Sequence, residues 1–158
     1  MIAPAELRRV FGYFATGVTV VTAVGRGGPC GLTVNSFASL SLDPPLLLVC
    51  VNSAARAYPC LAGAGTFAVN VLARGQEELA RRFASLETEK FVGLTYRQGP
   101  ATGAPVIAGV HAWLECRLAA RHPGGRTHAI FVGAIEGFGT GEDEPLLFHR
   151  GAYTRLIP

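Results

Sequence analysis

The chain has 158 residues, a formal net charge of +3, and a composition that is 49% hydrophobic and 16% charged. Such a chain can bury a substantial core, which excludes intrinsic disorder and predicts one domain over residues 1–158. No run of basic residues is longer than a pair, so we expect no nucleic-acid partner. The longest apolar run, residues 44–51, is too short to cross a bilayer, and no secretory signal opens the chain. We therefore expect a cytoplasmic protein without membrane contact.

The cysteines do not suggest a metal site. None of the four forms a C-x-x-C pair, so zinc binding has little support and we expect no metal. Thiols of cytoplasmic proteins are normally kept reduced. The sequence therefore predicts free, mostly buried thiols at Cys30, Cys50, Cys60 and Cys116.

Up to residue 51, we expect one helix and then three strands. Apolar residues recur at helical spacing from Leu7 to Phe14, which predicts an amphipathic helix over residues 4–16 that ends at Gly17. Runs of β-branched and apolar residues predict strands over residues 18–24, 30–34 and 46–51.

Turn and loop residues connect these strands. The glycine-rich residues 25–29 predict a hairpin turn. Residues 35–41 are small and polar and predict an irregular segment, and the prolines after them require an extended backbone over residues 43–45. Because residues 46–51 are apolar without alternation, we expect that strand to be buried on both faces.

The second half predicts two short helices and further strands. Asn52 and Ser53 are expected to begin a helix that ends near Leu61, and residues 75–84 form an amphipathic helix. Residues 86–110 are rich in glycine and proline and predict loops. Further strands are expected over residues 66–72, 111–122, 128–138 and 145–148, with a turn at 123–125 between the two long ones.

The long strand over residues 111–122 alternates between apolar and polar positions. Leu114 and Cys116 fall on its buried face, and Glu115 and Arg117 fall on the opposite face. Most strands are joined as hairpins rather than through helices. This favours a mainly β fold, with an antiparallel sheet closed into a barrel, over a doubly wound sheet.

The common catalytic motifs are missing. The chain has no G-x-G-x-x-G after a strand, no P-loop, no H-E-x-x-H and no G-x-S-x-G, and it has few histidines and aspartates. An enzyme so poor in acid–base groups would take its chemistry from a cofactor.

Two polar segments could hold such a cofactor. Residues 31–39 offer hydroxyl, amide and backbone N–H groups that can bond the edge of a heteroaromatic ring, but a polar loop with Asx and Ser turns also explains them. Ser53 is typical of a helix N-cap, which would place Arg56 in the first turn. That arrangement attracts phosphate, or it is a solvated arginine after an ordinary cap.

Other charged and aromatic residues are open to two interpretations. Arg81, Arg82 and Phe83 close a helix, where basic residues either favour the helix dipole or contact a phosphate or adenine group. His128 is expected at the start of a strand, where it either contacts a ligand or lies at the edge of the barrel without a functional role. Tyr153 in the tail either caps a pocket or packs the C-terminus.

Several motifs occur in an order that is more specific than any one of them. They are TGVTVVT at residues 16–22, TVNSF at 33–37, SLSLDPPL at 39–46, FAVNVL at 67–72, KF at 90–91 and RGAY at 150–153. In this order they resemble the flavin reductase family with the FMN-binding split barrel. That family includes the small reductase components of two-component flavin monooxygenases.

The resemblance implies a six-stranded antiparallel Greek-key split β-barrel with a few short flanking helices. It also implies a homodimer that binds FMN or FAD near the subunit interface. The residues expected along the isoalloxazine ring are Thr33, Val34, Asn35, Ser36 and Ser39. Those expected around the ribityl phosphate are Cys50, Val51, Asn52, Ser53 and Arg56, with Arg82 and Phe83 also beside the flavin. The nicotinamide pocket is expected to contain His128, as the catalytic positioning residue, and Tyr153.

The loop before His128 departs from the family pattern. The family usually has Gly-Asp-His at this point, whereas this chain has the sequence Gly125-Arg126-Thr127-His128. The aspartate is gone and the loop is one residue longer, which puts the orientation of the histidine in question. The charge of Arg126 favours a more anionic hydride donor such as NADPH.

The function that the resemblance implies is an NAD(P)H:flavin oxidoreductase, which transfers hydride from NADH or NADPH to FMN or FAD. Such an enzyme would supply reduced flavin to a partner monooxygenase. The altered loop keeps a second hypothesis open, a flavin-binding carrier or sensor that does not turn over nicotinamide. A third hypothesis is a non-catalytic β-barrel binding module.

Overall fold

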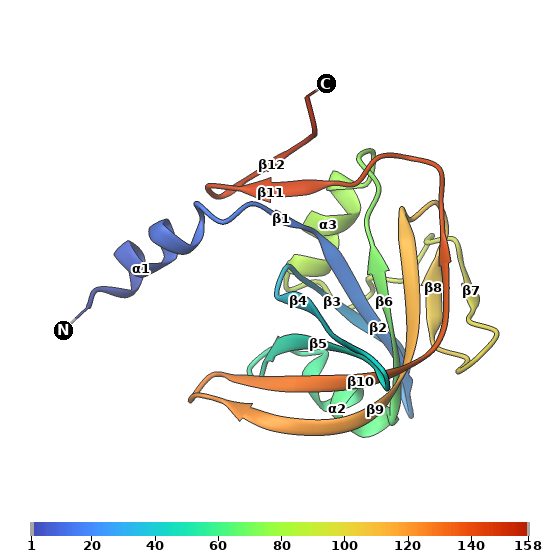
Figure 1. Ribbon diagram of the computed structural model, residues 1–158. Helices are drawn as coiled ribbons and strands as arrows, with labels where there is room; N and C mark the ends of the chain where they lie inside the picture. The colour runs from blue at the N-terminus through green and yellow to red at the C-terminus, as the bar shows by residue number, and fades with distance from the viewer. Residues whose placement is uncertain (1, 158) are drawn as a thin grey trace.

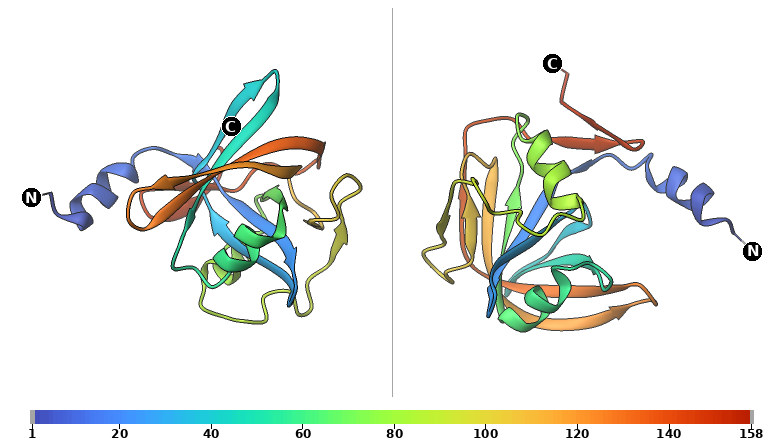
Figure 2. Two further views of the ribbon diagram at one scale, coloured as in Figure 1. Left: turned by 90° about the horizontal axis from the view of Figure 1, so that it is seen from below. Right: turned by 180° about the vertical axis from the view of Figure 1, so that it is seen from behind.

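One antiparallel sheet of seven strands forms the body of the molecule. In the computed structural model, which describes residues 2–157, its strands follow the order β3-β2-β6-β9-β10-β5-β4. The sheet curls so that β3 also contacts β5, which gives the split barrel seen in Figures 1 and 2. The strand bounds are β2 Thr19–Gly25, β3 Gly28–Val34, β4 Phe37–Leu42, β5 Pro45–Asn52, β6 Thr66–Val71, β9 Ala112–Gly124 and β10 His128–Thr140.

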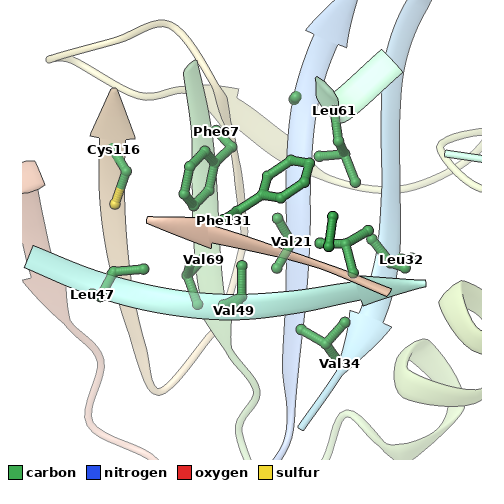
Figure 3. Packing of buried hydrophobic residues seen from close by; sticks show 13 residues of the cluster. Val21, Leu32, Val34, Leu47, Val49, Leu61, Phe67, Val69, Cys116 and Phe131 are labelled. Carbon is green, nitrogen blue, oxygen red and sulfur yellow. The ribbon is translucent and has the colours of Figure 1, made fainter. Parts of the chain in front are cut away.

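Six of these strands surround the core. β2, β3, β5, β6, β9 and β10 each contribute inward-facing side chains to one apolar cluster (Figure 3). Within it, the rings of Phe67 and Phe131 meet edge to face with their centroids 6.4 Å apart. β4 contributes no side chain to this cluster and extends the sheet beyond the barrel. The predicted mainly β fold with a six-stranded barrel is confirmed, with β4 as an additional edge strand.

Three helices lie outside the barrel: α1 Pro4–Phe11, α2 Tyr58–Ala64 and α3 Glu77–Ala84. α2 packs against β2, β3 and β6, and α3 packs on β3 and β2, where it buries Ala80 and Phe83. α1 projects away from the barrel (Figures 1 and 2) and buries no side chain. Within residues 2–157, no helix has the length and apolar character needed to span a membrane.

Two small sheets complete the fold. β1 Thr16–Gly17 pairs with β11 Leu147–His149, which pairs with β12 Ala152–Thr154, and β7 Tyr96–Gln98 pairs with β8 Pro105–Ile107. The Arg150 N–H donates a hydrogen bond of 2.7 Å to the Gly12 carbonyl, so the C-terminal hairpin also holds the N-terminal segment. β7, β8 and β12 were not predicted, because three residues are too few to show a periodicity.

The N-terminal helix is shorter than predicted. It ends at Phe11 and does not continue to residue 16. The N–H groups of Tyr13 and Phe14 then bond to the carbonyls of Val10 and Phe11 in a tight turn. Because α1 buries none of its apolar side chains, packing gives no support to a longer helix.

The segment predicted to be irregular over residues 35–41 is mostly a strand. β4 begins at Phe37 and pairs with β5 along its length. The prediction of an extended backbone at residues 43–45 is confirmed for Pro45, which begins β5. It was wrong for Asp43 and Pro44, which are joined by a cis peptide bond and form the turn of the β4–β5 hairpin.

β5 is buried on one face only, whereas the prediction was burial on both. Its buried positions alternate with half-buried ones, since neighbouring side chains of a strand point to opposite faces. Leu47, Val49 and Val51 lie in the core, and Leu46, Leu48 and Cys50 remain half-buried. β5 therefore presents an apolar outer face.

The other predicted elements agree with the structure within a few residues. β2, β3, β6, α3 and the β9–β10 hairpin confirm the expected strands and helix. The turn predicted at residues 123–125 lies two residues further on, since β9 runs to Gly124 and β10 begins at His128. The last predicted strand is β11, which begins at Leu147 rather than at residue 145.

Two of the four cysteines form a disulfide. Cys30 of β3 is bonded to Cys60 of α2, with their Cα atoms 6.5 Å apart, while Cys50 and Cys116 are free. The prediction of free thiols was wrong for this pair. The two residues are 30 positions apart in the sequence, and only the packing of α2 against β3 brings them together.

Candidate functional site

A cavity of about 400 Å³ lies where three segments of the chain meet. This main cavity is lined by Leu32 and Thr33 of β3, by Asn52 and residues 54–57, and by residues 83–86 with Lys90. A hollow of about 150 Å³ and another of about 520 Å³ adjoin it, and Arg56 lines all three. The three spaces therefore surround the side chain of Arg56.

β3 and α3 form one wall of the main cavity. The Thr33 hydroxyl donates a hydrogen bond of 2.7 Å to the Ala80 carbonyl, which fixes α3 on the strand. A Cβ atom at Gly31 would lie 2.8 Å from the Val21 carbonyl oxygen and 3.0 Å from the ring of Phe83. Glycine at position 31 therefore allows Phe83 to lie directly on β3.

The segment after β5 forms the second wall, and it is not the helix start that was predicted. The Asn52 side-chain oxygen accepts a hydrogen bond of 2.9 Å from the Ala54 N–H, an Asx turn, and the Ser53 N–H donates to the Thr127 carbonyl. α2 begins only at Tyr58. Ser53 is therefore not an N-cap, Arg56 does not lie in a first helical turn, and the helix-dipole argument for phosphate binding fails.

Two cationic side chains meet in the main cavity. Arg56 Nη1 donates to the Leu86 carbonyl at 3.1 Å, and Lys90 Nζ donates to the Phe83 carbonyl at 2.9 Å. Burial lowers the pKa of Lys90, and the charge of Arg56 lowers it further, while Glu87 opposes the shift. Two like charges held together favour an anion near them.

Lys90 is a site residue that the sequence reasoning did not assign. It occurs in a motif shared with the resembling family, but no role was given to it. The available signal was that Lys90 is the single lysine of the chain. Its place in the cavity depends on the loop over residues 85–92, which Arg82 Nη2 braces by donating to the carbonyls of Glu89 and Val92.

The structure brings together only part of the predicted flavin site. Of the predicted residues, Thr33, Asn52, Arg56 and Phe83 line the main cavity, and Arg82 lines the adjoining hollow of about 520 Å³. The lining does not include Val34, Asn35, Ser36, Ser39, Cys50, Val51 or Ser53.

Several of these remaining side chains are engaged elsewhere. Val34 and Val51 point into the core. The Ser36 hydroxyl donates to the Cys50 carbonyl at 2.9 Å and accepts from the Cys50 N–H at 3.1 Å, which joins the connection after β3 to β5. The hydroxyl of Ser36 therefore closes the barrel and is not a free donor for a ligand.

His128 lies beside the main cavity. It begins β10 directly opposite Asn52 of β5. Its Nδ1 atom lies 2.9 Å from the Thr127 hydroxyl, and the Thr127 carbonyl accepts the hydrogen bond from Ser53. The bond from Ser53 therefore ties the longer loop to the segment that lines the cavity, and it places the histidine next to that segment.

Tyr153 packs the C-terminus within this subunit. Its ring lies against Phe148, and the Arg81 guanidinium lies 5.0 Å from its centroid. Burial raises the pKa of Tyr153, with Arg81 opposing and Glu77 adding to the shift. Tyr153 is not among the residues that line the main cavity.

The lining of the main cavity fits a planar ring that carries an anionic tail. Ala54, Ala55, Ala84 and Leu86 offer accessible apolar surface to a ring, and Arg56 with Lys90 offers charge to a phosphate. FMN and FAD combine these two chemical features, so the residues present suit a flavin.

Comparisons with known proteins agree with this fit. Residues 11–156 match the model of a flavin reductase like domain. The chain is 40% identical over 160 residues to HsaB of Mycobacterium tuberculosis, the reductase subunit of a flavin-dependent monooxygenase, covering 99% of this chain and 84% of that protein. It is 45% identical over 158 residues to the NADH-dependent FAD reductase of Streptomyces globisporus, covering 97% and 86% of the two chains.

A solved structure supports the same assignment. The NADH:FAD oxidoreductase SgcE6 of Streptomyces globisporus, in complex with NAD and FAD fragments, matches with a TM-score of 0.92 at 43% identity. The match covers 100% of this chain and 97% of that one. By sequence and by fold, this chain therefore belongs to the flavin reductase family, as its motifs predict.

Proposed function

We propose that this chain is an NAD(P)H-dependent flavin reductase that supplies reduced flavin to a separate monooxygenase. The observation that carries the proposal is the convergence of Arg56 and Lys90 on the main cavity, in a chain of the flavin reductase family. The names of the relatives support NADH as donor, FAD as acceptor and a monooxygenase as partner. The enzyme class and cofactors expected from the sequence are confirmed, and the cytoplasmic location stays a prediction.

The residues of the chain bind and orient the two reactants. We place the flavin phosphate between Arg56 and Lys90, and the ring against Ala54, Ala55 and Leu86. Flavin, once bound, would supply the hydride acceptor, and this chemistry would need no acid or base from the protein. The apolar wall excludes water from the ring, and the two cations fix the tail and thereby the position of the ring.

Loss of the Lys90 charge is expected to weaken the binding of phosphate-bearing flavins. A charged hydrogen bond is worth about 1.5–3 kcal/mol, so Lys90→Met should raise the Kd for FMN and FAD by roughly 10-fold or more. Riboflavin, which has no phosphate, should bind both proteins equally well. Fluorescence titration of the three flavins measures these values.

Arg74→Met is the matched control for this prediction. It also removes one positive charge, but Arg74 is exposed and paired with Glu144 at 3.0 Å, and it does not line the main cavity. Its flavin affinities should equal those of the parent. An equal loss of riboflavin affinity in Lys90→Met would contradict the assignment of Lys90 to the phosphate.

His128 is expected to position the nicotinamide. His128→Ala should raise the KM for NADH by roughly 10-fold, the effect of losing about 1.5 kcal/mol of binding, while the Kd for FAD stays unchanged. Steady-state NADH oxidation and flavin titration separate the two effects. His122→Ala, an exposed histidine on the facing strand, is the control and should behave as the parent. A KM for NADH in His128→Ala equal to that of the parent would show that His128 does not position the nicotinamide.

We infer that apolar surface outside the barrel pairs two copies of the chain. The exposed fractions of Val10, Phe11 and Phe14 are 56%, 67% and 79%, and Phe37 and Leu40 of β4 are also exposed. Large exposed apolar patches mark protein interfaces. A homodimer would cover this surface, including the outer face of the β4–β5 hairpin.

The double variant Phe11→Asp/Phe14→Asp is expected to be a folded monomer. Neither side chain is buried in the subunit, so the unfolding free energy per subunit should change little while charge at the interface prevents pairing. Light scattering during size-exclusion chromatography measures the mass. Val24→Asp, at an exposed position of β2, is the control and should remain dimeric. A parent protein with the mass of one chain would refute the dimer.

The reductase function is tested by NADH and NADPH oxidation with added FMN, FAD or riboflavin. We expect oxidation that depends on both the protein and the flavin, with NADH and FAD as an effective pair. Rates equal to the background without protein under every condition would refute the function. Protein that binds flavin and leaves both nicotinamides unreacted would identify a carrier or sensor.

A further inference from the structure

The Cys30–Cys60 disulfide joins two walls of the main cavity. Cys30 of β3 lies two residues before Leu32, and Cys60 of α2 lies three residues after Ala57, which ends the segment lining the second wall. Any change in this bond therefore acts on the spacing of the two walls between which we place the flavin.

The disulfide is accessible from two sides. A cavity of about 590 Å³ opens between the β2–β3 turn and α2, and Cys30 and Cys60 both line it together with Arg26. Cys30 also lines the hollow of about 150 Å³ that shares Arg56, Ala57 and Lys90 with the main cavity. Both cysteines are half-buried. The larger cavity has room for a small molecule, and the charge of Arg26 attracts anionic thiolates.

The other two cysteines do not share these properties. Cys116 is fully buried in the core, and burial raises its pKa to about 12, so it stays a protonated and unreactive thiol. Cys50 is half-buried on β5 and does not line the cavity of about 590 Å³. Exchange chemistry is therefore expected at the Cys30–Cys60 pair.

We propose that Cys30–Cys60 is a thiol–disulfide exchange site for low-molecular-weight thiols, and that its redox state sets the affinity of the protein for flavin. The inference rests on the proposed function, because it assigns the flavin to the main cavity. In the oxidised form the bond holds the two walls together and retains flavin. In the reduced form the walls can separate, and flavin exchanges more readily.

The exchange balances without any further reactant. The thiolate of the small molecule attacks one sulfur, the Cys30–Cys60 bond breaks, and the displaced cysteine thiolate takes a proton. A second small thiol cleaves the mixed disulfide, which leaves two cysteine thiols and one small-molecule disulfide. The reverse direction uses hydrogen peroxide, which forms when O₂ takes two electrons and two protons from released reduced flavin. The peroxide oxidises the two thiols to the disulfide and is reduced to two molecules of water.

Without the disulfide, the second wall is held by two hydrogen bonds to other segments and by the packing of Ala55 and Ala57 on the core. The Ser53 N–H is bonded to the Thr127 carbonyl, and Arg56 is bonded to the Leu86 carbonyl at 3.1 Å. The Arg56 bond is to a loop that itself belongs to the site. Reduction is therefore expected to loosen the exposed residues Ser53, Ala54 and Arg56, while the barrel core, to which α2 contributes Leu61, stays folded.

Flavin titration of the oxidised protein and of the same protein reduced with millimolar glutathione tests the proposal. We expect the Kd for FAD to rise about 5-fold or more on reduction, the lower end of ordinary coupling between sites. Alkylation and mass spectrometry verify which cysteines are reduced, and far-UV circular dichroism verifies folding. The double variant C30S/C60S should have the Kd of the reduced protein and should not respond to glutathione.

Two outcomes would overturn the proposal. One is an unchanged Kd after verified reduction, and the other is a disulfide that resists glutathione or whose reduction unfolds the protein, which would make the bond purely structural. The reductase function is judged separately. Redox-dependent FAD binding without NADH oxidation in either state would support the exchange site and refute the reductase.

Discussion

Replacement of Gly99 by alanine is expected to lower the free energy of unfolding by more than about 3 kcal/mol, among the largest effects of any single substitution in this chain. An added Cβ would lie 2.0 Å from Glu115 Oε1 and 2.2 Å from the carboxyl carbon. Glu115 is completely buried, and its carboxylate accepts hydrogen bonds from the Thr102 N–H at 2.8 Å, the Thr102 hydroxyl at 2.9 Å and the Ala101 N–H at 3.2 Å.

The cost arises because the carboxylate has nowhere to move. On the other side of the carboxylate, an added Cβ at Gly137 would be 3.1 Å from Glu115 Oε2, so the backbone at Gly137 also packs closely against the carboxylate. Alanine at position 99 must displace either the loop over residues 99–104 or Glu115 itself, and it leaves a buried carboxylate with fewer partners. At about 2–4 °C per kcal/mol for a domain of this size, the Tm should fall by roughly 6–12 °C.

Gly63→Ala is the matched control with the opposite expected sign. Gly63 lies inside α2, and an added Cβ there meets nothing within 4 Å. Alanine in a helix interior is favoured over glycine by about 0.5–1 kcal/mol, so the Tm should stay or rise. Thermal unfolding followed by circular dichroism compares both variants. A Gly99→Ala protein as stable as the parent would show that the Glu115 carboxylate is not held in a fixed position by the loop over residues 99–104.

Asn70→Leu is expected to cost about 3 kcal/mol or more, because the side-chain amide of Asn70 holds β8 on the barrel. The amide is completely buried and donates to the Val20 carbonyl at 3.1 Å, the Thr22 hydroxyl at 3.0 Å and the Pro105 carbonyl at 3.4 Å. Its oxygen accepts from the Ile107 N–H at 2.8 Å. Leucine would leave that buried N–H without a partner, a cost of about 1–3 kcal/mol beyond the lost bonds.

Thr22→Val provides the comparison for Asn70. The Thr22 hydroxyl donates to the Pro105 carbonyl at 2.5 Å and accepts from Asn70. Its removal leaves Asn70 bonded to Val20, Pro105 and Ile107, so we expect a smaller loss of about 1–2 kcal/mol. Urea denaturation of both single variants and the double variant measures their coupling. An Asn70→Leu protein within 1 kcal/mol of the parent would contradict a role of the amide as the main link to β8.

Local patterns predicted most of the barrel but not what covers it. The β-branched runs of β2 and β6 identified strands because such side chains suit a half-buried pleat. Glu115 was expected on the exposed face of β9 because it alternates with Leu114 and Cys116. It is instead completely buried, because the loop over residues 99–104 folds over it and supplies its hydrogen bonds. No local pattern encodes that contact.

The candidate site was harder to predict because it depends on contacts between distant segments. Asn52 was expected to open a helix, and it forms an Asx turn, since both structures use a side-chain oxygen bonded to a nearby backbone N–H. Cys30 and Cys60 meet only through the packing of α2. Lys90 enters the cavity only because its loop folds back onto α3, as its bond to the Phe83 carbonyl shows. Arg56 was predicted from a helix start that the structure does not contain, and from the family resemblance.

The central claim is that the flavin phosphate lies between Arg56 and Lys90, with the ring against the apolar lining of the main cavity. A crystal structure of the protein in complex with FMN tests it most directly. The account predicts phosphate density within hydrogen-bonding distance of both cations, and the isoalloxazine ring beside β3. FMN density in another part of the molecule, with Arg56 still bonded to Leu86 and Lys90 to Phe83 alone, would contradict it.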